Sequence, residues 1–160
     1  MRTFDSPEAF GSFLIALAQQ VDDRAAQALR EGAQIVAEDA KARIGHYDGN
    51  DWPQLAQFTR DERTRLGFSP DDPLFRTGAL RDAITSEGVE HSAVAGVKFG
   101  TTNKDGVDLG DIASEQEMGT PDAKRPIPPR PFLAPAGFAR EQEIAEKIAL
   151  AAADAFAGKI

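Results

Sequence analysis

Residues 6–44 read SPEAFGSFLIALAQQVDDRAAQALREGAQIVAEDAKARI, and this stretch decides the fold class. Its apolar residues recur at steps of three and four, which places them along one stripe of a helix. Ser6 suits an N-cap, Pro7 the first helical position and Gly45 the position after the last turn. The pattern predicts a helix over 6–44, about 57 Å long at 1.5 Å per residue. Either it breaks near Gln19–Asp22, or it projects and packs against a neighbouring subunit.

Two later segments have their own periodicity. Residues 83–90 and 93–100 predict two strands of a β-hairpin, with Ala95, Val97 and Phe99 on one face. Residues 136–157 predict a second amphipathic helix, whose apolar side carries Phe138, Ile144, Ile148, Ala152 and Phe156. Long helices at both ends of a small antiparallel hairpin predict an α+β fold, in a single domain over 1–160.

The connections are expected to be irregular. Residues 45–82 predict a loop with short helices. Thr59 opens one of these helices through a capping box with Glu62, and Thr77 caps a short turn that ends near Asp82. Residues 101–135 predict an acidic loop, one helical turn at 113–118, and a stiff proline-rich arm that leads into the last helix.

Composition excludes several kinds of protein. The 160 residues include no cysteine, so disulfides, thiolate zinc sites and cysteine nucleophiles are ruled out. No apolar run approaches the length of a membrane span, and the first ten residues lack the apolar core of a signal peptide. The net charge of −8 argues against a nucleic-acid binder with a basic face. The acid is concentrated in residues 81–120.

No catalytic or metal-binding pattern emerges. The acidic stretch 105–111 and the turn at 48–51 both lack the ligand spacing of a calcium loop, so solvated turns are expected. His91 and Ser92 are adjacent strand residues that point to opposite faces. Nucleophile-elbow and phosphate-loop motifs are absent. We expect no catalytic residue, cofactor or metal; a pair of carboxylates is the one enzymatic arrangement left open.

Two stretches carry unusual side chains. Trp52 and Tyr47 lie in one loop. Two interpretations are open: the aromatic side chains bury themselves and anchor the loop, or they anchor an interface with another protein. The arm R-P-I-P-P-R-P-F-L at 125–133 allows three interpretations: a polyproline ligand, an extended arm laid across a neighbouring subunit, or a lead-in that docks Phe132 and Leu133 into the core. Arg130 can donate to carboxylates or carbonyls within or between subunits.

The order of several short motifs resembles the phage virion morphogenesis (tail completion) family and the related head–tail joining or neck proteins. The first part is Gly49-x-x-Trp52-Pro53-x-Leu55, Thr59 with Arg63, and Leu74-x-x-Thr77-Gly78-x-Leu80-x-x-x-Ile84. The second part is Glu117-x-Gly119-Thr120 followed by Ile127-Pro128-x-Arg130-Pro131-Phe132-Leu133. The resemblance covers roughly residues 20–157.

The resemblance implies a structural virion protein that completes the tail or joins it to the DNA-filled head. Such proteins form rings around the DNA channel, commonly sixfold, and need no cofactor. The implied partners are further copies of the chain, the tail tube, tail terminator or head-closure proteins, and DNA that passes without specific binding. The implied location is the neck or head-proximal tail end of the virion, and the host cytoplasm during assembly. The expected interface or arm residues are Trp52, Leu55, Thr77, Gly78, Leu80, Gly119, Arg130, Pro131, Phe132 and Leu133.

The negative charge suits a DNA channel, because acids repel phosphate and let DNA slide. We therefore expect part of the 81–120 acid, in particular Asp105, Asp108 and Asp111, to face the lumen. An alternative is an acidic DNA mimic that inhibits a host nucleic-acid-binding protein. Such a mimic should spread its acids along one face, whereas here they cluster in one loop.

Overall fold

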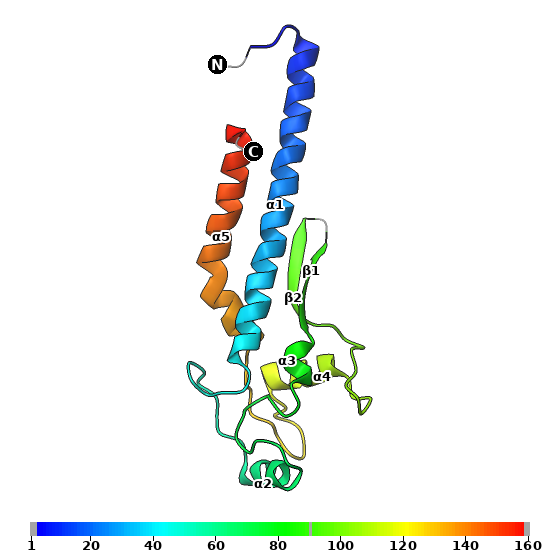
Figure 1. Ribbon diagram of the computed structural model, residues 1–160, viewed down its shortest axis with the longest axis vertical. Helices are drawn as coiled ribbons and strands as arrows, with labels where there is room; N and C mark the ends of the chain where they lie inside the picture. Colours follow the sequence, from blue (N-terminus) through cyan, green and yellow to red (C-terminus); the bar gives the residue numbers. More distant parts are fainter. Residues whose placement is uncertain (1–2, 90, 159–160) are drawn as a thin grey trace. The chain divides into compact units, whose positions relative to one another are not determined.

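The computed structural model describes residues 3–89 and 91–158. The elements follow the chain as α1 (Pro7–Arg43), α2 (Gln57–Arg65), α3 (Ala79–Asp82), β1 (Ile84–Val89), β2 (Ser92–Val97), α4 (Leu109–Met118) and α5 (Leu133–Ala157) (Figure 1). β1 and β2 pair as a two-stranded antiparallel sheet. The expected α+β class is confirmed.

The chain forms two compact units. The helical unit comprises Met1–Ala33, Glu87–Val94 and Glu141–Ile160, and the core unit comprises Gln34–Ser86 and Ala95–Arg140. Both long helices contribute residues to each unit. The expectation of a single domain over 1–160 remains a prediction.

In the helical unit, α5 runs beside α1, and the first turns of α1 extend past the end of α5 (Figure 1). The two helices approach closely at Gly32, where a Cβ would lie 2.8 Å from Cγ2 of Ile144. Ala28, Ala33 and Ala155 are buried in this unit. Small side chains therefore let the two backbones come together.

The core unit holds the hydrophobic core. Its buried members are Ala37, Ala40, Ile44, Trp52, Leu80, Ile84, Ala113, Phe132 and Ala136. They come from α1 and the residue after it, the 45–56 loop, α3, β1, α4, the end of the proline-rich arm and α5. Segments that are far apart in sequence therefore meet in one cluster.

The long first helix follows its local signals. The amide of Ala9 donates to Oγ of Ser6 at 3.1 Å, which is the expected N-cap. Gly45 follows the helix with φ 107°, a conformation that glycine adopts without steric cost. α1 continues without interruption through Gln19–Asp22, so the alternative of a break there is wrong.

Several element boundaries differ from expectation, and β2 ends at Val97 instead of residue 100. α2 begins at Gln57, so Thr59 lies inside the helix and the Thr59–Glu62 capping box is wrong. α4 begins at Leu109 instead of Ala113. α5 begins at Leu133 instead of residue 136. Pro135 fits the first turn because amides there lack an acceptor within the helix.

Some side chains assigned to apolar faces are exposed. Phe99 lies beyond the end of β2 and is 67% exposed, whereas Ala95 and Val97 are half-buried. Phe138 and Phe156 of α5 are 78% and 68% exposed. Periodicity identified the helix correctly, but these aromatic side chains do not lie on the side that packs within the chain.

Candidate functional site

The proline-rich arm is fastened to the 45–56 loop by two side chains that the sequence analysis singled out. Nε1 of Trp52 donates to the carbonyl oxygen of Pro131 at 3.0 Å. Nε and Nη2 of Arg130 donate to the carbonyl oxygen of Pro53 at 3.2 and 3.0 Å, and Nη2 also donates to that of Gln54 at 3.3 Å. Prolines lack an amide donor, so side-chain donors hold these two segments together.

The same arm supplies core residues. Phe132 is completely buried, and Leu133 packs against the hydrophobic core. Within the chain, the arm is thus an ordered lead-in to the last helix, the third of the three interpretations. A role of the same residues between subunits is not tested and stays a prediction.

Glu117 of α4 anchors the start of α5, a role that sequence reasoning missed. Its Oε2 accepts from the amides of Phe132 and Leu133 at 2.8 and 3.0 Å, and its Oε1 accepts from the amide of Ala134 at 2.8 Å. A carboxylate at a helix N-terminus satisfies unpaired amides and complements the helix dipole. In the sequence, Glu117 stands out only as the first residue of the Glu117-x-Gly119 motif. Nothing near it in the sequence indicates that its carboxylate caps the last helix.

Gly119 makes the sharp turn after α4. Its φ is 75°, and a Cβ there would lie 2.8 Å from the carbonyl oxygen of Ile127 and 3.0 Å from Cδ of Pro129. The neighbouring Thr120 accepts from the amide of Ile127 through its hydroxyl at 2.9 Å and donates its own amide to the carbonyl of Ile127 at 3.0 Å. Glycine is therefore required where the arm crosses back over the end of α4.

The Thr77-Gly78-x-Leu80 motif forms the start of α3. Oγ1 of Thr77 accepts from the amide of Ala79 at 3.3 Å, and Gly78 has φ 85°. Leu80 is 6% exposed and lies in the hydrophobic core. Leu55, at the end of the Trp52 loop, is likewise buried. These residues build the core unit.

A cavity of about 820 Å³ opens on the core unit. It is lined by side chains of α2, α3, α4, the 103–107 loop and the arm. Leu80, Leu109 and Ile112 give it an apolar side, and Arg63 and Arg130 are its most deeply buried cations. Such a concave, partly apolar surface with a few convergent charges suits the binding of a ligand or partner.

The two cations are held by backbone carbonyls. Nη1 of Arg63 donates to the carbonyl oxygen of Asp72 at 2.6 Å, and Arg130 donates to the carbonyls of the Trp52 loop. Burial lowers the pKa of Arg63 below its ordinary value, and the positive charge of Arg76 lowers it further. Burial likewise lowers the pKa of Arg130. Both guanidinium groups remain charged at neutral pH, since arginine is not deprotonated in proteins.

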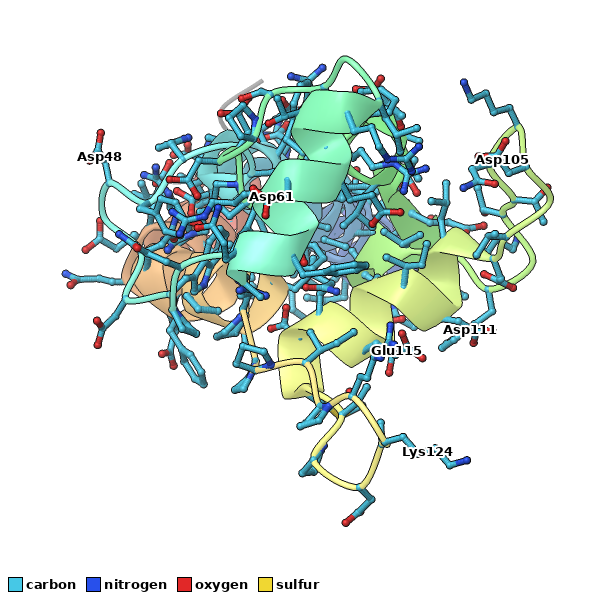
Figure 2. The ribbon with its side chains drawn as sticks, turned by 90° about the horizontal axis from the view of Figure 1, so that it is seen from below. Asp48, Asp61, Asp105, Asp111, Glu115 and Lys124 are labelled. Carbon is cyan, nitrogen blue, oxygen red and sulfur yellow. The ribbon has the colours of Figure 1, made fainter. Side chains whose placement is uncertain are left out.

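The three acids expected at a lumen differ in their surroundings. Asp105 and Asp111 are exposed on the 103–107 loop and the first turn of α4 (Figure 2). Asp108 is the N-cap of α4: Oδ1 accepts from the amide of Gly110 and Oδ2 from that of Gly100, both at 2.7 Å. Asp108 therefore has a structural role, while Asp105 and Asp111 are available for contacts outside the chain.

Residues 3–89 and 91–158 contain no group of three or more acidic or histidine side chains positioned to hold a metal ion. None of the helices in this part of the chain is long and apolar enough to cross a membrane.

Comparison with known protein families gives a match. A family model described as "Bacteriophage HK97-gp10, putative tail-component" matches residues 8–119, which extend from α1 to the turn after α4. Curated proteins and solved structures gave no match. The match includes Trp52, Leu55 and the Thr77-Gly78-x-Leu80 motif, and it ends before the arm.

Proposed function

We propose, because the chain belongs to the HK97-gp10-like family of bacteriophage tail components, that it is a structural virion protein of a tailed phage or phage-like particle. In this proposal it completes the tail, joins the tail to the head, or does both, as one subunit of a ring around the DNA channel. The observation that carries the proposal is the family match over residues 8–119. The protein acts by assembly and not by catalysis, and it needs no cofactor.

The surface of the helical unit supports a role in assembly. Phe10, Leu14 and Ile15 of α1 are 46%, 45% and 65% exposed, and Leu150 of α5 is 63% exposed. Residues 9–21 contain no charged side chain. Exposed apolar side chains gathered on one segment are typical of surfaces that contact another protein. The first turns of α1 are therefore suited to pack against a neighbouring subunit or another tail protein.

The proposed partners are further copies of the chain, in a ring that is commonly sixfold, and the tail tube, tail terminator or head-closure proteins. The proposed location is the neck or the head-proximal end of the tail. Genomic DNA passes through the ring without specific binding. The exposed carboxylates of Asp105 and Asp111 support this, because acids at a lumen repel the phosphate backbone.

Electron microscopy of a lysate from the source genome with this gene deleted tests the proposal. Filled heads beside separate tails, rescued by the gene supplied in trans, are expected. Normal, infectious particles would contradict the proposal and favour an acidic DNA mimic that acts on a host protein.

A further inference from the structure

Three arginines line the cavity of the core unit, and among the described residues the only carboxylate whose negative charge acts on the buried pair is that of Asp72, beside Arg63. Arg63 and Arg130 are 9% and 4% exposed, and Arg76 is exposed at the rim. Within residues 3–89 and 91–158, none of the three forms an ion pair with an acidic side chain. Arg63 and Arg130 are held by backbone carbonyls, which satisfy their N–H groups but leave their positive charge without a salt bridge, so the cavity is suited to receive an anion.

The cavity is also shaped for a protein segment. Leu80, Leu109 and Ile112 supply apolar surface beside the cations. Three acids, Asp82, Asp105 and Glu115, also line it and are exposed. Asp82 is paired with Arg81 at 3.1 Å. A mixture of apolar surface and buried cations fits a short acidic peptide turn better than a DNA phosphate backbone.

An acidic turn of this kind exists on the same unit. Nδ2 of Asn50 donates to the carbonyl oxygens of Arg43 and His46 at 3.0 and 3.3 Å, which holds the 48–51 turn in shape. Asp48 and Asp51 are exposed, and in the described part of the chain neither carboxylate has a partner. The turn therefore presents two free negative charges on a fixed backbone.

The turn and the cavity are separate surfaces of the core unit, although both border the 45–56 loop, since Leu55 lines the cavity. Figure 2 shows Asp48 at one edge of the view and Asp105, one of the residues that line the cavity, at the opposite edge. Two different surfaces of one subunit that complement each other generate head-to-tail contacts, which close into a ring when the rotation permits. We propose that the Asp48–Asp51 turn of one copy enters the arginine-lined cavity of the next copy. This inference rests on the proposed function, since it specifies how neighbours in the ring recognise each other.

Cysteine cross-linking tests the contact, because the natural chain has no cysteine. The variant Asp48→Cys with Thr77→Cys places one thiol on the turn and one beside the cavity, and it retains Asp51 and all three arginines. The matched control is Asp48→Cys with Lys124→Cys, because Lys124 is exposed in the loop just before the arm and does not line the cavity (Figure 2). Each purified chain is treated with a short bismaleimide linker and examined on denaturing gels, and the wild type is examined by native mass spectrometry.

The expected result is a ladder of covalent multimers for the turn–cavity pair and at most faint dimers for the control pair. A closed wild-type oligomer without a ladder, or with equal ladders for both pairs, would overturn this inference and leave the proposed function standing. A wild-type chain that stays monomeric at every concentration, without a ladder, would remove both the ring and this contact.

Charge exchange gives a second, independent readout. Reversing the charge of the turn with Asp48→Arg and Asp51→Arg should weaken self-association about tenfold or more. Reversing the charge of the cavity rim with Arg76→Glu should have an effect of the same size. Combining the three substitutions should restore most of the wild-type self-association. Circular dichroism confirms that each variant is folded. If the triple variant loses as much self-association as the turn variant and the rim variant lose together, the turn and the cavity do not meet.

Discussion

The indole nitrogen of Trp52 donates to the carbonyl oxygen of Pro131 at 3.0 Å, and this bond joins a loop and an arm that are 79 residues apart in sequence. Arg130, next to Pro131, donates back to the carbonyls that follow Trp52. The two segments therefore hold each other, and the last helix starts directly beyond them.

Trp52→Phe should lower the free energy of unfolding by about 1–3 kcal/mol, because it removes the donor and leaves the Pro131 carbonyl without its partner. Urea denaturation followed by circular dichroism measures the change, since Trp52 is the chain's sole tryptophan and fluorescence would be lost. Phe58→Leu, at a side chain that is 68% exposed, is the control and should have little effect. A Trp52→Phe variant as stable as the wild type would show that the bond contributes nothing.

Phe132→Ala should cost about 3–5 kcal/mol, because it leaves a cavity at a completely buried position. Phe138→Ala is the matched control, since Phe138 is 78% exposed and the same substitution there should cost less than about 0.5 kcal/mol. Thermal and urea unfolding of both variants give the comparison. If Phe132→Ala left the monomer stable but abolished assembly, the arm would have to act between subunits.

Glu117→Gln should destabilise the start of α5 by about 1–2 kcal/mol, since glutamine keeps one neutral acceptor oxygen where the carboxylate uses two charged ones, and its NH2 group cannot accept from a backbone amide. Hydrogen exchange at the amides of Phe132, Leu133 and Ala134 should become faster. Glu115→Gln, two residues earlier on the same helix, is the control and should leave these amides unchanged. Unaltered exchange in Glu117→Gln would mean that the carboxylate charge is not needed for the cap.

The cap of α4 should be sensitive to acid. The backbone amide of Gly100, followed by those of Gly110 and Asp111, lowers the pKa of the Asp108 carboxyl below its ordinary value. A carboxyl whose pKa is lower in the folded chain stabilises the fold above its unfolded pKa, near 3.9, and loses this effect as pH falls through the folded value. Asp108→Asn should therefore be less stable than the wild type at neutral pH, with the difference shrinking on acidification. A difference that is constant with pH would contradict this assignment.

Asp105→Lys with Asp111→Lys should slow DNA ejection, because exposed cations at a lumen would hold the phosphate backbone. Asp108 is left unchanged, because its loss would disturb the start of α4. Asp61→Lys with Asp122→Lys, which changes the charge equally, is the control. Equal ejection kinetics for the two variants and the wild type would place Asp105 and Asp111 away from the channel.

The sequence by itself determined the features that depend on neighbours along the chain. The helix expected over 6–44 is observed as Pro7–Arg43, because its apolar spacing, the Ser6 cap and the Gly45 stop all act within a few residues. The hairpin and the last helix were found by the same local periodicity. The ordered motifs also sufficed for the resemblance to phage tail proteins, which the family match confirms.

Only the tertiary structure decided where the arm, the caps and the cavity lie. The hydrogen bonds of Arg130 reach 76 and 77 residues back, and Glu117 caps a helix 15 to 17 residues ahead. Nothing in the spacing of residues specifies such partners, because loop closure brings them together only when the whole core unit folds. For the same reason, periodicity could not say that Phe138 is exposed while Phe132, six residues earlier, is buried.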